Sequence, residues 1–199
     1  MRSQTAAVMA GLAVLVASIA TAVVMTVTTG GDTSPGHRDS MSAGSGAMAH
    51  VHGSRVASEY DYLSEMVAHH EEAVVAAREL ERSERPEMRA FGDSIVESQT
   101  AQIDQMQHWL DDWYPDRSGQ VDYQTMTRDL TGLSGDELDR VFLEDMVGHH
   151  MAAVMMSQQL LARGVADHAQ VDELARTIRD DQHAEIFEMQ QWLDDWFGR

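Results

Sequence analysis

The chain has 199 residues, of which 43% are hydrophobic and 24% charged, enough for one globular domain with a sizeable core plus additional segments. Its formal net charge of −19 argues against nucleic acid and anionic lipid headgroups as partners, because both would be repelled, and favours cations. The absence of cysteine excludes disulfides, thiolate metal sites and iron–sulfur clusters, so a soft metal would have to bind Met or His.

The N-terminal 27 residues carry the most apolar stretch of the chain. An unbroken run of apolar and small residues covers 6–27, after a single Arg2. A membrane helix needs about 20 such residues, and the core of a cleaved signal peptide has about 7–15. Residues 1–27 are therefore expected to be a signal peptide or an N-terminal membrane anchor. Both predict an extracytoplasmic protein, secreted or held at the membrane by this segment.

Residues 28–57 have the composition of a linker. They are rich in Gly, Ser and Ala and poor in large apolar residues, so we expect a disordered tether that adds little to stability. Weak metal capture by its scattered His and Met residues and an incidental occurrence both remain open. These residues are His37, Met41, Met48, His50 and His52.

Residues 58–199 show helical periodicity and form the predicted folded domain. Apolar residues recur at about 100° per residue in four segments. The expected helices cover 59–83, 86–113, a third from the capping box of Ser134 and Glu137 to 163, and a fourth from the cap Asp167 to 197. A polar connection over 114–133 joins the second and third. The all-α pattern predicts a four-helix bundle.

An internal repeat divides these helices into two equivalent pairs. The sequence Met-Val-Ala-His-His at 66–70 returns as Met-Val-Gly-His-His at 146–150. A second shared block ends in Trp-Leu-Asp-Asp-Trp and occupies 95–113 and 178–196. The unit of the fold is therefore one helical hairpin, used twice with pseudo-twofold symmetry.

The apolar stripes of the first and third helices carry histidines. His70 and His150 lie at the centre of their stripes and are expected to point into the bundle. His69 and His149 lie at the border, each one turn after a carboxylate that could accept a ring N–H. These two carboxylates are Glu65 and Asp145.

The second and fourth helices complete a polar layer in the core. Gln102 and Glu185 occupy the centres of their stripes, and on all four helices a thioether lies one turn from the polar residue. The predicted metal ligands are His70, His150, His69, His149, Met66, Met146, Glu185, Met106 and Met189.

Two interpretations of this layer remain open. Its side chains could only satisfy one another's hydrogen bonds, or they could bind a metal. Imidazole and thioether donors favour copper, especially Cu(I), with zinc second because thioethers suit zinc poorly. A di-iron site needs four inward Glu, and only Glu185 is available. Because no catalytic triad, phosphate loop or pair of inward carboxylates is evident, we expect a non-enzymatic protein.

At these residues the chain resembles the secreted bacterial proteins known as domain of unknown function 305, within the ferritin-like superfamily. The resemblance rests on Met-hydrophobic-x-His-His-x-x-Ala-Val at 66–74 and 146–154, and on Gln-x-x-Glu-Ile-x-x-Met-x-x-Trp-Leu at 99–110 and 182–193. It implies an exported four-helix bundle, and CopM-like members imply copper binding. The first copy departs from the pattern, because Gln102 stands where Glu is expected, which makes that half a poorer cation site.

The leading hypothesis is an exported protein that sequesters or hands on copper. The alternatives are a structural or protein-interaction module of the cell envelope and a ferritin-like metal-dependent oxidoreductase. Replacing His70 and His150 with Leu should abolish tight copper binding and leave the bundle folded, because two polar groups leave the core. Replacing His69 and His149 should weaken binding less.

Overall fold

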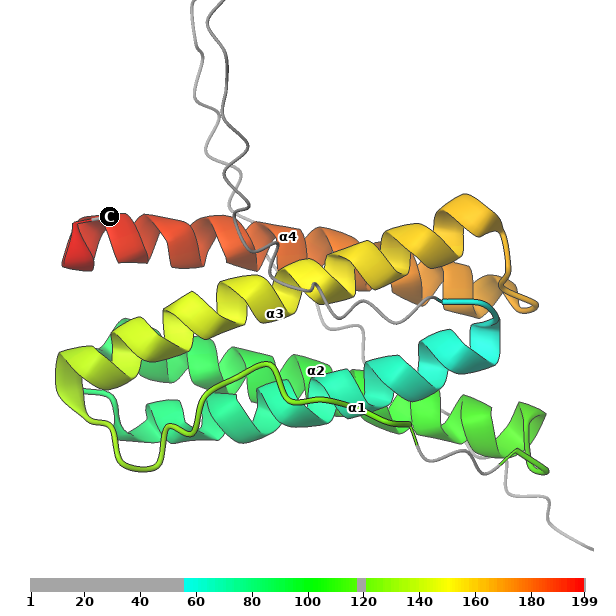
Figure 1. Cartoon of the computed structure of the whole chain (residues 1–199), viewed down its shortest axis with the longest axis horizontal. Coiled ribbons are helices and arrows are strands. Elements are labelled where there is room, and N and C mark those ends of the chain that lie inside the picture. Colours follow the sequence, from blue (N-terminus) through cyan, green and yellow to red (C-terminus); the bar gives the residue numbers. More distant parts are fainter. Residues whose placement is uncertain (1–55, 118–120, 199) are drawn as a thin grey trace, which may run out of the picture. The chain divides into compact units, whose positions relative to one another are not determined.

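A computed structural model describes residues 56–117 and 121–198, and within these ranges all regular structure is helical. The elements are α1 (Glu59–Arg78), the short 3-10 helix η1 (Glu79–Arg82), α2 (Pro86–Trp113), α3 (Gly135–Arg163) and α4 (Ala169–Phe197). They form the four-helix bundle that the sequence predicts (Figure 1).

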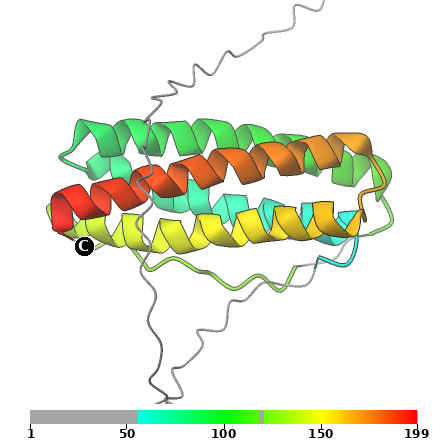
Figure 2. The ribbon, with the colours of Figure 1, turned by 90° about the horizontal axis from the view of Figure 1, so that it is seen from above.

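Each repeat folds as one antiparallel hairpin (Figure 2). Helix α1 packs along α2, α3 packs along α4, and the hairpins meet where α1 contacts α3. Pro86 is the first residue of α2, where its missing N–H leaves no hydrogen bond unmade. Gly164 ends α3 with φ of 60°, a left-handed conformation that favours glycine. The duplication therefore places the two histidine-bearing helices next to each other.

Two predicted helix caps differ in the structure. Ser134 precedes α3 in an extended conformation, but its side chain makes no capping hydrogen bond, so the predicted capping box is wrong. Asp167 does not cap α4, which begins after His168. Instead, the N–H groups of Asp167 and His168 donate to the buried carboxylate of Glu59, at 2.7 and 2.8 Å. The cap of α4 is thus supplied from the start of α1, which no local pattern reveals.

The first predicted helix, over 59–83, has a regular part that ends at Arg78. The chain then tightens into η1 up to Arg82, and Ser83 is extended. This 3-10 ending of an α-helix is common where the chain turns into a neighbouring helix.

The folded part begins before residue 58. Val56 falls within the predicted linker over 28–57, yet it is fully buried, and its carbonyl oxygen accepts a hydrogen bond from Arg163 at 2.8 Å. The predicted signal peptide or anchor over 1–27, and the linker up to residue 55, lie outside the described residues. Among the helices that the structure does describe, none is long and apolar enough to cross a membrane.

The apolar core is divided into two clusters. One contains Leu80, Met88 and Phe142, and the other contains Tyr62, Leu63 and Leu160. Along α1 the His-His pair separates the residues of one cluster from those of the other, and along α3 it does the same except for Val154, which follows the pair but belongs to the first cluster. A polar layer therefore crosses the middle of the core.

The repeated tryptophans pack at the edges of these clusters. Trp192 stacks on Trp196 beside the first cluster, and Trp109 stacks on Trp113 beside the second, with ring centroids 5.2 and 5.3 Å apart. All four rings are partly buried. This packing agrees with a structural role for the repeated Trp-Leu-Asp-Asp-Trp segments.

Candidate metal centre

The four repeated histidines form one row of rings across the bundle. The ring centroids of His70 and His69 are 6.4 Å apart, those of His69 and His149 are 3.6 Å apart, and those of His149 and His150 are 6.1 Å apart. The central two rings are parallel within 3°. Adjacent helix residues point about 100° apart, so one His of each pair faces the other repeat and one faces its own hairpin partner.

The central pair corrects the expectation that His69 and His149 lie at the border of the core. Both are buried, because α1 and α3 pack on each other and cover the side of the stripe that the sequence alone leaves exposed. Nor does Asp145 hold the ring of His149, since its carboxylate accepts hydrogen bonds from Arg128. The N–H of His69 Nε2 donates instead to the backbone carbonyl of His149, at 3.0 Å.

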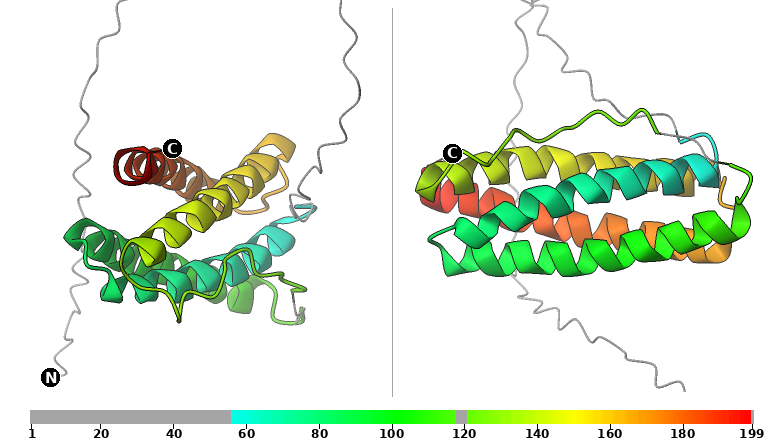
Figure 3. Two further views of the ribbon diagram at one scale, coloured as in Figure 1. Left: turned by 60° about the vertical axis from the view of Figure 1, so that its left-hand side comes forward. Right: turned by 90° about the horizontal axis from the view of Figure 1, so that it is seen from below.

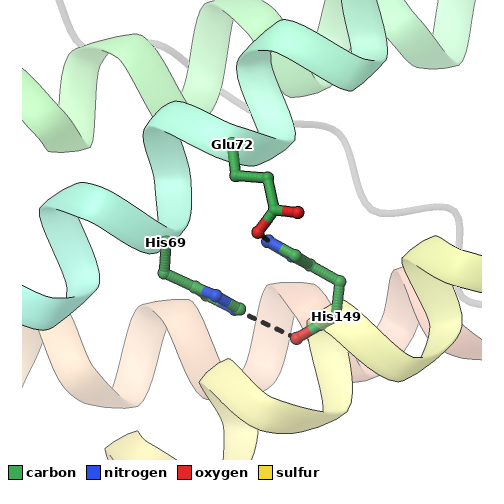
Figure 4. Close-up of side chains that lie close together, drawn as sticks. All are labelled: His69, Glu72 and His149. Atoms are coloured by element: carbon green, nitrogen blue, oxygen red, sulfur yellow. Dashed lines mark hydrogen bonds and ion pairs between the residues drawn. The ribbon is translucent and has the colours of Figure 1, made fainter. Parts of the chain in front are cut away.

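A carboxylate that the sequence interpretation missed lies beside this pair. Glu72 Oε2 is 3.4 Å from His149 Nε2, and the side chain is only 8% exposed (Figure 4). Ligand atoms of His69, Glu72 and His149 all lie within 4.8 Å of one another. Throughout the described part of the chain, no other group of three His or acidic residues comes as close. The available signal was the spacing, because Glu72 follows His69 by three residues and shares its helix face.

The outer histidines pair as the polar-layer prediction implies. The N–H of His70 Nε2 donates to Gln102 Oε1 at 2.8 Å, and that of His150 Nε2 donates to Glu185 Oε2 at 2.7 Å. Glu185 is 22% exposed, so it connects the layer to solvent. Metal-binding histidines almost always donate their second ring N–H in this way, which fixes the tautomer and orients the ring.

Several ring nitrogens of this layer have no hydrogen-bond partner. Nδ1 of His70 and Nδ1 of His150 are buried without one, and both ring nitrogens of His149 also make none, although its Nε2 lies 3.4 Å from the Glu72 carboxylate. Once Nε2 carries the proton, Nδ1 is left as a lone-pair donor. A buried polar atom without a partner costs on the order of 1–3 kcal/mol, and metal coordination would remove that cost.

Burial favours the neutral form of three of these imidazoles, those of His69, His70 and His149, and the neutral form is the one that binds metals. Burial lowers the pKa of His69 well below its usual value, and the nearby His149 and His70 lower it further. Burial lowers the pKa of His70 to about 3, although the hydrogen bond to Gln102 opposes the change. Burial also lowers the pKa of His149, with Glu72 opposing.

Glu72 is the ionised member of the central group. Burial by itself raises its pKa, but hydrogen bonds from the surrounding groups outweigh that effect and lower the pKa to about 2. The site therefore combines neutral imidazoles with one buried negative charge. That combination favours binding of a cation over an anion.

The predicted thioether ligands are fully buried but divided between the two apolar clusters. Met66 and Met106 belong to one cluster, and Met146 and Met189 belong to the other. Each cluster thus contributes one Met from each helix of a hairpin. This symmetric placement suits both of the roles left open above, core packing and soft-metal ligation.

The fold and the site together define a class of protein: a duplicated helical hairpin that buries a row of imidazoles where its two halves meet. The chain belongs to the family described as domain of unknown function (DUF305), whose model matches residues 59–193. Among curated proteins, none matches the chain.

Solved structures of the same family have the same fold. CopM in its Cu(I)-bound form is 29% identical, with a TM-score of 0.63, over 71% of this chain and 99% of CopM. The Cu(II)-bound form of CopM gives 28% and 0.59, over 70% and 98%. A DUF305 fragment from Deinococcus radiodurans is 28% identical, with a TM-score of 0.60, over 69% of this chain and 95% of the fragment. CopM has also been crystallised with silver.

Proposed function

We propose that this chain is an exported copper-binding protein that sequesters the ion or hands it on without turnover. The observation that carries the proposal is the buried row of four imidazoles, several of whose ring nitrogens make no hydrogen bond. Export rests on the apolar run over residues 6–27, which remains a prediction. Metal cations are the partners that this chemistry requires.

Copper is the preferred cargo for two reasons. Imidazole with nearby thioether donors suits copper better than zinc, because zinc binds thioethers poorly. The metal-bound CopM structures carry Cu(I), Cu(II) or silver, and Cu(I) and silver are soft monovalent ions. We therefore place copper first and zinc second.

Within the row, the central pair is the proposed primary site. His69 and His149 bring their rings together beside the carboxylate of Glu72. His70 and His150 flank this pair, each oriented by its own acceptor, Gln102 or Glu185. The thioethers of Met66, Met106, Met146 and Met189 are proposed as auxiliary ligands of the two flanking positions.

One observation favours the alternative in which the polar layer only stabilises the fold through its own hydrogen bonds. Both outer imidazoles already donate a hydrogen bond, and His69 contacts partners through both ring nitrogens. In that case the layer would fix the register of the two hairpins and bind no metal.

Cu(I) affinity of the full-length chain separates these functions. It would be measured without oxygen, by competition with a chromophoric chelator. The His69→Ala/His149→Ala variant should bind at least about 100-fold more weakly, since loss of supporting residues alone typically costs 10–100-fold. The His70→Leu/His150→Leu variant should lose less, the reverse of the order suggested by the sequence, because the central rings are the ones brought together.

A matched control uses the exposed histidines His108 and His183. The His108→Ala/His183→Ala variant removes the same number of imidazoles and should bind as the parent does. Circular dichroism would verify that each variant is folded. Equal Cu(I) affinity of the central-pair variant and this control would refute the proposed function.

A further inference from the structure

The connection between the hairpins passes over the candidate metal centre. We call residues 121–131 the strap. It runs along α1 (Figure 3), and its Tyr123 hydroxyl reaches both His69 Nδ1, at 3.0 Å, and Glu72 Oε2. The strap therefore touches two of the three groups that would hold the metal.

Glu72 is the main attachment point of the strap. Its Oε1 accepts hydrogen bonds from the N–H of Met126, the N–H of Thr127 and the hydroxyl of Thr127, each at 2.7 Å. Its Oε2 accepts the hydroxyl of Tyr123. Both oxygens of this carboxylate therefore accept hydrogen bonds from the strap, so a metal that binds either oxygen must compete with it.

The strap buries little apolar surface, so few apolar contacts strengthen this attachment. Of the strap residues, only Leu130 is buried. A cavity of about 380 Å³, lined in part by Glu72, Tyr123 and Thr127, lies on one side of the strap. Another, of about 580 Å³, is lined by Ser64, Val67, Ala68, Val121 and Asp122. Segments held by a few hydrogen bonds with little buried apolar surface open locally at low free energy.

The hydrogen bonds around Tyr123 are also mutually frustrated. His69 uses the proton on Nε2 to bond the His149 carbonyl, so its Nδ1 is an acceptor. Tyr123 has a single proton, which it donates to Glu72, and its oxygen then faces the lone pair of His69 Nδ1. The lone pairs of His69 Nδ1 and of the Glu72 carboxylate thus point to the position of the hydroxyl oxygen, and a cation at that position could be coordinated by both.

We propose that Tyr123 is a plug that copper displaces, so that metal binding to His69 and Glu72 releases the strap over residues 121–127. Arg128 would keep the far end attached, because it donates to Glu144 and Asp145 on α3. The metal-free and metal-bound proteins would then differ at an exposed segment. This inference rests on the proposed function, since it concerns the regulation of the same site.

Two measurements on the full-length chain test the plug. In the first, Cu(I) affinities of the parent, Tyr123→Phe and Tyr114→Phe are compared. Removing the competing hydroxyl should tighten binding about tenfold, since a hydrogen bond to a charged group is worth about that factor in water. Tyr114→Phe is the control, because the Tyr114 hydroxyl also donates to a buried carboxylate, that of Glu59, at 2.9 Å, outside the metal centre. It should bind as the parent does.

The second measurement needs no variant. Hydrogen exchange of the parent should show that Cu(I) accelerates exchange of the Met126 and Thr127 amides, which donate to Glu72 without metal. Unchanged or weaker binding by Tyr123→Phe, or unchanged or greater protection of these amides, would overturn the plug. If the parent still binds through His69 and His149, the proposed function survives that result. If the His69→Ala/His149→Ala variant binds equally well, both fail.

Discussion

Histidine 70 should make the stability of the metal-free bundle depend on pH. In the folded chain, burial lowers its pKa to about 3, against an ordinary value of 6.5. Between these pH values the unfolded state binds a proton that the folded state excludes. The contribution of neutral, buried His70 to the unfolding free energy is therefore complete above pH 6.5 and is lost progressively as the pH falls toward 3.

The size of the effect follows from the pKa difference. One pH unit below the unfolded pKa corresponds to about 1.36 kcal/mol. Lowering the pH from 7 to 5 should therefore remove about 2 kcal/mol of unfolding free energy through His70 alone. His69 and His149 act in the same direction, because burial also lowers their pKa values. The carboxylates Glu59 and Glu72, whose pKa values are lowered, lose their contribution only at more acidic pH.

Urea denaturation of the metal-free chain at pH 7 and pH 5 measures this loss. His70→Leu should lose about 2 kcal/mol less than the parent over this range, because the titrating group is gone. Gln102→Leu is the matched control, since it breaks the same hydrogen bond and keeps the imidazole. That bond raises the pKa of His70, so the control should lose at least as much as the parent. An identical loss of unfolding free energy in His70→Leu and the parent would refute the inference that His70 is buried in its neutral form.

Two further changes test the packing. Gly92→Ala should destabilise the bundle by about 1–3 kcal/mol, because a Cβ there would lie 2.7 Å from the Ala77 carbonyl oxygen. Gly148→Ala is the control, because its Cβ would meet nothing within 4 Å. Equal urea midpoints for the two variants would contradict the reasoning. Deleting residues 28–54 should leave the melting temperature nearly unchanged. Val56→Ala should lower the free energy of unfolding by about 1.5 kcal/mol, because the Val56 side chain is fully buried. A fall of many degrees in the melting temperature on deletion alone would show that the linker packs on the bundle.

The helices, the hairpin repeat and the outer pairs of the polar layer were predictable because each depends on local periodicity or on the duplication. His70 pairs with Gln102, and His150 pairs with Glu185, since the centres of two apolar stripes at equal depth must meet. The depth of His69 and His149 was not predictable, because a helical wheel does not say which neighbour covers the border of a stripe. That depends on the packing of α1 against α3.

The role of the connection was also beyond the sequence. Tyr123 lies in a polar segment with no periodicity, and its contact with His69 spans 54 residues. The path of such a segment is set by where its backbone N–H groups find acceptors. Here they find Glu72, which a wheel assigns to the face of His69 but which has no visible partner in the sequence.

The duplication explains why the central site is one-sided. The histidines are repeated, but the carboxylates are not: the position equivalent to Glu72 is Ala152, and the position equivalent to Glu185 is Gln102. A cation held by ring nitrogens of His69 and His149 would therefore have a carboxylate only on the α1 side, where the strap is attached. An ion bound to Oε2 of Glu72 would compete with Tyr123, because the Tyr123 hydroxyl donates to the same oxygen atom. The asymmetry that makes the site attractive to a cation is thus the same asymmetry that couples the site to the strap.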